Sequence, residues 1–378
     1  MATTTRKSKA DTKSPGGPSD DDVVENIESE VQDHAYSPPS YDIVTYPADF
    51  TLEVLVNKIT KDPSEIQIPP FQRKFVWTQA QASKLIESFL LGLPVPPIFL
   101  YTDAKNIQMV VDGQQRLKSI AYFYEGFFGP EDRGRRPVFR LIGLNERSPY
   151  RDLSYRDLES QDASAFRKLN DSVLRAFVIK QLNPKDHTSV FHVFERLNTG
   201  GTFLTGQEIR NCVYAGSFND LLLELNSLPQ WREIFGKTGE DKRQRDVELV
   251  LRFLALNFAA KDYKKPMKDF LSNFMFEHKN PTKATLRRFQ DEFTNTAIAL
   301  VKHLGPKPFH IRAGLNAAAF DSVAVAFAKH LTKIPKDIAK RFTHLKANVA
   351  FEKRISSATT DEESLSDRMS TAVKELFG

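Results

Sequence analysis

The spacing of hydrophobic residues changes along this chain and divides it into three stretches. Residues 1–46 are rich in Ser, Thr, Lys, Asp and Pro and poor in large apolar side chains, as is typical of a disordered tail. Residues 47–216 alternate short apolar runs with stretches of helical spacing, and from 217 to 378 only helical spacing remains. The pattern predicts an α+β domain over 47–216, followed by an all-α helical bundle over 217–378.

The mixed stretch contains apolar runs of strand length that are bounded by turn-forming residues. They cover residues 66–68, 94–101, 107–111, 138–141 and 177–182. Helical spacing is found over 52–59, 78–92, 117–124, 190–197 and 205–216, with a more polar helical insertion near 155–169. We therefore expect a small mixed sheet accompanied by helices.

The last stretch predicts a series of amphipathic helices and no strands. Helical spacing covers 221–228, 247–258, 267–276, 284–304, 313–331 and 361–377. The polar residues 236–245 predict a junction between two of these helices.

Two helix starts carry a capping box, in which a Ser or Thr is followed by Glu or Gln three positions later. Thr78 with Gln81 predicts one start, and Thr205 with Glu208 predicts the other. We therefore interpret Glu208 as a cap and not as a catalyst. Arg210 and the neighbouring Asn211 are not explained by capping.

The residues Asp112-Gly113-Gln114-Gln115-Arg116 lie between the apolar run 107–111 and the helical spacing that begins at Leu117. Asp112 as N-cap with Gln115 would form a capping box. Arg116 is not explained in this way, because a cation in the first turn opposes the helix dipole. A phosphate held by the guanidinium and the first backbone N–H groups would remove the conflict. The residues leave both interpretations open.

Other polar residues are candidates for a site because of where they stand. Gln72 and Arg73 follow two prolines on an irregular segment between apolar residues, and such loops often carry function. Glu87 lies off the apolar stripe of its helix, as a surface residue or as a site carboxylate. The pair Gly200-Gly201 ends a helix and can also let the backbone approach a ligand closely.

Composition excludes several classes of protein. The formal net charge of +5 is compatible with nucleotide or nucleic acid ligands but does not require them. Cys212 is the only cysteine, which excludes an intramolecular disulfide and a cysteine zinc cluster. There is no Walker phosphate loop, no apolar signal core and no run long enough to span a membrane. We expect a cytoplasmic protein.

Three groups of residues carry a resemblance to a known family. They are Ile68-Pro69-Pro70-Phe71-Gln72-Arg73, then 112–116, then Asn198-Thr199-Gly200-Gly201 with Thr205, Glu208 and Arg210. In this order they resemble the N-terminal domain of the GmrSD type IV restriction endonucleases, which belongs to the ParB/sulfiredoxin-like superfamily. The resemblance covers roughly residues 50–216. The helical remainder is similar to the extension of stand-alone members.

The resemblance implies a nucleoside triphosphatase that regulates or powers cleavage of modified phage DNA by a separate nuclease domain. By position, the implied catalytic residues are Asp112, Gln114, Gln115 and Arg116. The implied nucleotide-binding residues are Gln72, Arg73, Gly113, Arg116, Asn198, Gly200 and Gly201. The arginines would neutralise phosphate charge, either Gln114 or Gln115 would orient water, and Asp112 would cap the helix or hold Mg²⁺.

The chain departs from those enzymes in one respect, because its histidines form no cluster comparable with their His-Asn-His nuclease site. We therefore expect a regulatory or sensor component. Its expected partners are a nucleotide (ATP, GTP or CTP), DNA and a separate nuclease subunit, and an oligomer is compatible with the sequence. Two alternatives stay open. One is a ParB-like nuclease or nicking protein, for which Asp112 and Glu87 are the nearest metal ligands, and the other is a non-enzymatic DNA-binding adaptor.

Overall fold

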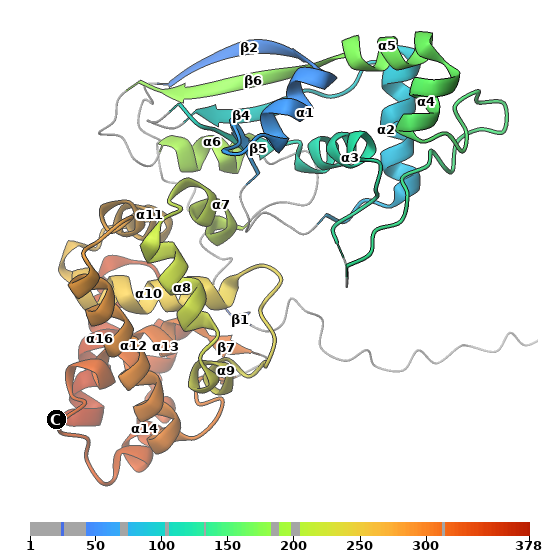
Figure 1. The fold of residues 1–378 in the computed structure, drawn as a ribbon. Coiled ribbons are helices and arrows are strands. Elements are labelled where there is room, and N and C mark those ends of the chain that lie inside the picture. The colour runs from blue at the N-terminus through green and yellow to red at the C-terminus, as the bar shows by residue number, and fades with distance from the viewer. Residues whose placement is uncertain are drawn as a thin grey trace, which may run out of the picture.

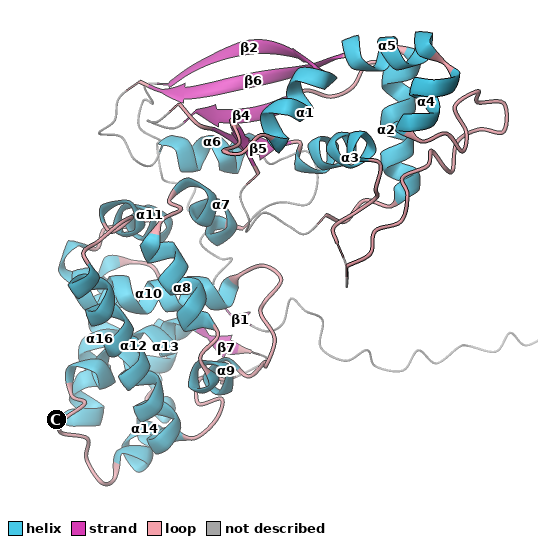
Figure 2. Cartoon of the chain, in the orientation of Figure 1, coloured by secondary structure: helices cyan, strands magenta, loops and turns pink. Residues whose placement is uncertain are grey.

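The computed structural model describes residues 24–25, 43–68, 75–102, 106–131, 134–182, 189–197, 205–311 and 314–378. It is a mixed α+β structure that is mostly helical, as predicted (Figure 1). Figure 2 shows that the larger strands lie together in one part of the molecule, while the C-terminal part is helical apart from two very short strands.

The larger sheet has five strands in the order β2-β6-β4-β5-β3. The strands are β2 Ile43–Thr51, β3 Ile66–Gln67, β4 Ile98–Thr102, β5 Gln108–Asp112 and β6 Val173–Gln181. β6 pairs antiparallel with β2 and parallel with β4, whereas β5 pairs antiparallel with β4 and parallel with β3. The sheet is therefore mixed, and it places the C-terminal end of β5 beside β4.

One face of the sheet shares a core with five helices. They are α1 Leu52–Thr60, α2 Gln79–Leu91, α3 Gln114–Glu125, α4 Tyr155–Gln161 and α5 Ala163–Asp171. Leu100 and Val110 from the sheet join Phe89 and Ile120 from these helices in one buried core. Because side chains alternate along a strand, the neighbours Phe99 and Tyr101 are available to the opposite face.

The opposite face of the sheet packs against α6 Ser189–Leu197, which α7 Gly206–Val213 follows in the chain. The ring of Tyr101 lies 6.3 Å from that of Phe194 on α6. Phe191 and Phe194 belong to a second core, which also contains Val111 of β5 and the apolar residues of the C-terminal half. The helix α6 thus connects the sheet to the helical part.

The C-terminal half consists of helices without a fixed repeat. They are α8 Ser217–Asn226, α9 Pro229–Phe235, α10 Arg245–Ala259, α11 Met267–Glu277, α12 Lys283–Leu304, α13 Ala317–Lys329, α14 Ile338–Ala347, α15 Val349–Ser356 and α16 Glu362–Phe377, with a 3₁₀ turn at Ala260–Asp262. The helices α10 and α13 form its centre and are buried on all sides over most of their length. None of the helices in the described ranges has both the length and the apolar content to cross a bilayer.

A buried ion-pair network joins the two central helices. Arg252 of α10 donates to Asp321 of α13 at 2.7 Å, and Arg368 of α16 approaches the same carboxylate at 3.4 Å. All three side chains are almost completely buried. Removing one partner from such a pair leaves an uncompensated buried charge, at a cost of about 3–5 kcal/mol. The aspartate that interrupts the apolar run of α13 is therefore part of the fold.

Several expected elements differ from the structure. Residues 138–141 form no strand: Val138 makes only an isolated bridge to Phe127, while Phe139 and Leu141 are buried in the core. Within the predicted tail, β2 begins at Ile43, and β1 Val24–Glu25 pairs parallel with β7 Leu315–Asn316. The division into domains at 46 and 216 stays a prediction.

Candidate functional site

The candidate motif begins at an irregularity in the pairing of β4 and β5. Phe99 lies opposite Asp112, but Leu100 lies opposite Val110, so the register shifts by one residue at Val111. Such a bulge adds a residue to one strand and redirects the side chains that follow. It precedes the turn into α3 directly and therefore determines where Asp112 points.

Gly113 is the N-cap of α3 and has a φ of +100°. A Cβ at this position would lie 2.3 Å from Cγ2 of Ile98. Both the backbone conformation and the contact with β4 therefore require glycine here. Because Gly113 is the N-cap residue and makes no side-chain cap hydrogen bond, the capping box of Asp112 and Gln115, one of the two open interpretations, is not formed.

Arg116 pairs with Asp112 across the first turn of α3. Its Nη2 donates to Oδ2 of Asp112 at 2.8 Å and to the carbonyl oxygen of Pro97 at 3.0 Å, while its buried Nε has no partner. The Arg116 side chain is 17% exposed and that of Asp112 43%. A carboxylate thus accounts for the arginine that capping did not explain, and the pair is open to solvent on the aspartate side.

Gln115 binds the backbone of Val76 and Trp77 to the start of α3. Its Oε1 accepts hydrogen bonds from the backbone nitrogens of Val76 at 3.0 Å and Trp77 at 3.3 Å. The ring of Phe75 packs against that of Tyr122 on α3 at 5.1 Å. The chain just after residues 69–74 therefore adjoins the motif, and β3, just before them, pairs with β5.

Of the other predicted site residues, the structure describes only Gln114. Gln114, the first residue of α3, is half-buried. Gln72, Arg73, Asn198, Gly200 and Gly201 lie outside the described residues. The helices that flank the last three are described: α6 ends at Leu197, and α7 begins after Thr205.

The comparison with known families decides the identity of this region. Residues 52–215 match the family described as the GmrSD restriction endonuclease, N-terminal domain. These residues belong to that family. No curated protein matches the chain. The GmrSD-type domain runs from α1 to just beyond α7 and contains the 112–116 motif, while α8 to α16 lie outside it.

The end of the GmrSD-type domain is attached to the helical half by polar contacts. The capping box of Thr205 and Glu208 is confirmed, and the Thr205 hydroxyl also donates to the carbonyl of Arg243 at 2.9 Å. Arg210, which capping left unexplained, donates to Glu248 of α10 at 2.6 Å and stacks on the ring of Phe191. These residues support the structure where α7 meets α10.

Asn211, the second residue that capping left unexplained, is also part of this network. Its side chain accepts from Gln207 at 2.8 Å and donates to Gln244. Glu87, the other candidate carboxylate of the GmrSD-type domain, accepts a hydrogen bond from the hydroxyl of Ser148. That contact gives it a structural partner outside the 112–116 motif.

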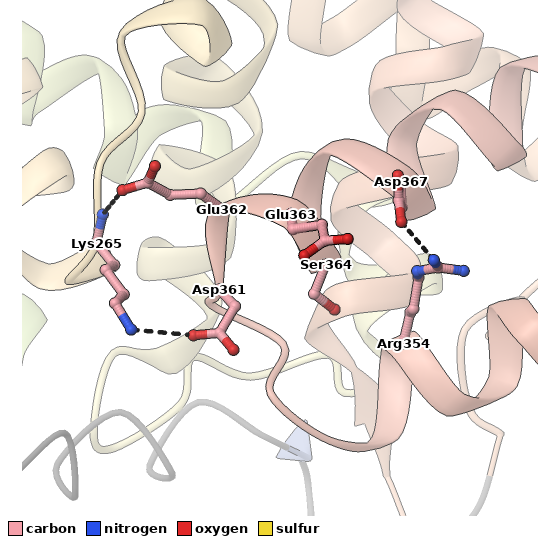
Figure 3. Close-up of a pocket in the computed structure, with 7 residues that line it drawn as sticks. All are labelled: Lys265, Arg354, Asp361, Glu362, Glu363, Ser364 and Asp367. Carbon is pink, nitrogen blue, oxygen red and sulfur yellow. Dashed lines mark hydrogen bonds and ion pairs between the residues drawn. The ribbon is translucent and has the colours of Figure 1, made fainter.

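Hollows of about 450 Å³ and about 680 Å³ lie in the helical half, and neither is lined by a predicted site residue. One, of about 450 Å³, lies at the start of α16 (Figure 3). Lys265 pairs there with Asp361, and Arg354 pairs with Asp367. The other, of about 680 Å³, is lined by the loop 236–245. Among the described residues, no three His, Cys, Asp or Glu side chains gather as metal ligands.

Proposed function

We propose that the GmrSD-type domain binds a nucleoside triphosphate at the N-terminal end of α3 and hydrolyses it. In this proposal the chain is the regulatory or sensor component of a restriction-like phage defence system and acts with a separate nuclease subunit. The family match supports the connection with restriction. The observation that carries the proposed chemistry is the solvent-open pair of Arg116 and Asp112 at a helix start whose N-cap residue is Gly113.

The electrostatics of the α3 start favour an anion. The first turn contains no acidic residue, so its backbone N–H groups and the positive end of the helix dipole are not offset from within the helix. Arg116 adds a full positive charge one turn in. A triphosphate that approaches from the exposed side of Asp112 competes with that carboxylate for the guanidinium.

We assign different roles to the two glutamines of the motif, Gln114 and Gln115. The side-chain oxygen of Gln115 already accepts two backbone N–H groups, so we assign Gln115 a positioning role. We assign the orientation of the attacking water to Gln114, which the family resemblance also implies as a catalytic residue. Arg116 stabilises the negative charge that develops on the transferred phosphoryl group, a kind of contact that depends on preorganised donors.

The residues present fit Mg²⁺ only as an ion that arrives with its nucleotide. Asp112 offers one half-exposed carboxylate, and nucleotide-bound Mg²⁺ commonly uses one or two protein carboxylates together with phosphate oxygens and water. When bound, the ion would supply charge neutralisation for the phosphates. Asp112 would contact the ion while Arg116 turned toward the phosphates.

The test is the release of inorganic phosphate from ATP, GTP and CTP, each with Mg²⁺ present. Arg116→Ala removes one charged donor, and we expect kcat/KM to fall by about 10²–10³-fold. Arg140→Ala is the matched control, because Arg140 is an exposed arginine of the same domain that pairs with Asp157. Binding and turnover that Arg116→Ala leaves unchanged, or their absence in the wild type, would overturn the proposal.

A further inference from the structure

The net charge of the chain is modest, but positive charge is concentrated in one segment of the helical half. Residues 329–353 contain six lysines and one arginine but only two acidic residues, a formal charge of +5. The whole chain also has a formal charge of +5, so the remaining residues sum to zero. This one segment thus carries as much net positive charge as the whole chain, and it lies outside the residues that match the GmrSD family.

The structure places this segment on the outside of the helical half. It runs from the last residue of α13 through α14 into α15. Ile338, Phe342 and Leu345 of α14 are buried in the core, so the opposite side of the helix faces solvent. We call the exposed lysines of this segment the lysine surface: Lys329, Lys333, Lys336, Lys340, Lys346 and Lys353. In Figure 1, α14 lies at the end of the helical half away from the sheet.

Carboxylates within the protein do not neutralise the lysine surface. Asp337 pairs with Arg341 at 3.1 Å, and the next arginine along the chain, Arg354, pairs with Asp367. Within the described ranges, none of the six lysines forms an ion pair. Lys346 lies over the ring of Phe342 at 4.8 Å, which leaves its charge in place. A cluster of like charges repels itself, and a polyanion would relieve that repulsion.

We propose that the lysine surface binds the phosphate backbone of duplex DNA. This rests on the proposed function in one respect, since a restriction-like component acts on DNA. Lysines on flexible stems act as point charges toward phosphates and are poorly suited to bidentate recognition of bases. The predicted consequence is binding that depends strongly on salt and little on sequence.

The same residues do not suit insertion into a membrane. A helix that lies in a bilayer surface exposes large apolar residues beside its basic ones, whereas the apolar residues of α14 are buried in the core. Val349 is the single large apolar residue that is exposed in this segment. DNA is therefore the polyanion that the surface fits better.

The experiment measures fluorescence anisotropy of a labelled duplex with the full chain at several salt concentrations. The variant K333Q/K336Q/K340Q removes three charges from the lysine surface. The control K84Q/K168Q/K180Q removes three exposed lysines from the GmrSD-type domain and gives the same net charge. We expect the first variant to reduce the slope of log K against log salt by about 2.7, since each phosphate contact contributes about 0.9. The control should keep the wild-type slope.

Three outcomes would overturn the inference. They are no DNA binding by the wild type, equal losses in both variants, or binding to phosphatidylserine vesicles that is as strong as binding to DNA. Phosphate release is measured on the same samples. If the wild type releases no phosphate but its DNA affinity depends on the lysine surface, the DNA inference stands and the proposed nucleotide chemistry fails.

Discussion

Single residues at the start of α3 serve the fold and the candidate chemistry together. Gly113 makes room for Ile98, Asp112 holds Arg116, and Gln115 holds the backbone of Val76 and Trp77. Loss of activity in a variant is therefore not sufficient evidence that a residue touches substrate. Each role needs a measurement that reports on structure as well as on turnover.

The positioning role of Gln115 gives the first prediction at this scale. Gln115→Ala removes the acceptor of two backbone N–H groups, so the segment after residue 74 should open more often. Trypsin cleaves after Arg73 and Lys74, and we expect cleavage there to be about 5-fold faster, which corresponds to about 1 kcal/mol for the lost hydrogen bonding. Timed digestion followed by mass spectrometry gives the rate.

Gln79→Ala is the matched control for this measurement. Gln79 is also a glutamine of the GmrSD-type domain whose side chain bonds to a backbone group, the carbonyl oxygen of Arg140 at 2.7 Å. Equal cleavage rates in the Gln115 and Gln79 variants would contradict the assigned role.

Some contacts of the site residues could be predicted from the sequence, and others could not. The caps at Thr78 and Thr205 were predictable, because a capping box involves only residues three apart. That Asp112 does not cap α3 was harder to predict. Arg116 competes for its carboxylate and is itself held by the carbonyl of Pro97. The i,i+4 spacing of Asp112 and Arg116 is visible within the motif, but the contact of Arg116 with Pro97, just before β4, leaves no signal there.

The helix α6 lies between the sheet and the helical half and contacts both. Its Phe194 packs on Tyr101 of β4. On its other side His192 contacts Asp269 of α11 at 3.1 Å, and Glu195 pairs with Lys268 at 3.2 Å. A change at this contact therefore affects how α6 is attached to α11.

The contact predicts a dependence of stability on pH. Burial lowers the pKa of His192, but its hydrogen bonds to Asp269 and Glu195 outweigh burial and hold the pKa above its usual value. Because the pKa is higher in the folded state than in the unfolded chain, protonated His192 stabilises the fold below about pH 6.5. That contribution is lost as the pH rises through the raised pKa.

Urea unfolding at several pH values between about 6 and 8 checks this expectation. The wild type should lose stability over that interval, and His192→Gln should flatten the change, because glutamine does not titrate. His303→Gln, at the last turn of α12, is the control for a histidine outside the contact. A wild-type curve that is flat, or that rises with pH, would count against the role of His192.

Periodicity predicted most helices and strands because it records which face of an element is buried. It identified α1, α2, α3, α6 and α10 to α13 within a few residues. It failed at 138–141, where apolar residues enter the core from irregular backbone that bonds to Gly126 and Leu153. The short helices α14 and α15 were not predicted, although Ile338, Phe342 and Leu345 of α14 stand at helical spacing.

For the whole molecule, the core does not end where the family match ends. Residues 52–215 match the GmrSD model, but Phe191, Ile209 and Cys212 are buried in the same core as the helical half. The polar network of Arg210 with Glu248 crosses the same boundary. The helices α6 and α7 therefore share buried surface with the helical half, while the rest of the GmrSD-type domain has a core of its own.

This continuity predicts the outcome of a truncation. A fragment of residues 43–216 would expose the apolar side of α7, and each large apolar side chain moved to water costs about 1.5–3 kcal/mol. We expect the fragment to aggregate or to bind a hydrophobic dye, while the full chain does neither. Size-exclusion chromatography and dye fluorescence make the comparison. A soluble monomeric fragment with cooperative melting would show that the GmrSD-type domain folds alone.

The pairing of β1 with β7 attaches the chain to the helical half by strand pairing at a point that precedes the GmrSD-type domain in the sequence. The chain enters the helical half at Val24–Glu25, returns to the sheet by Ile43, and enters the helical half again after α7. Deleting the first thirty or so residues would remove β1 and leave the backbone groups of Leu315–Asn316 without the strand that pairs with them.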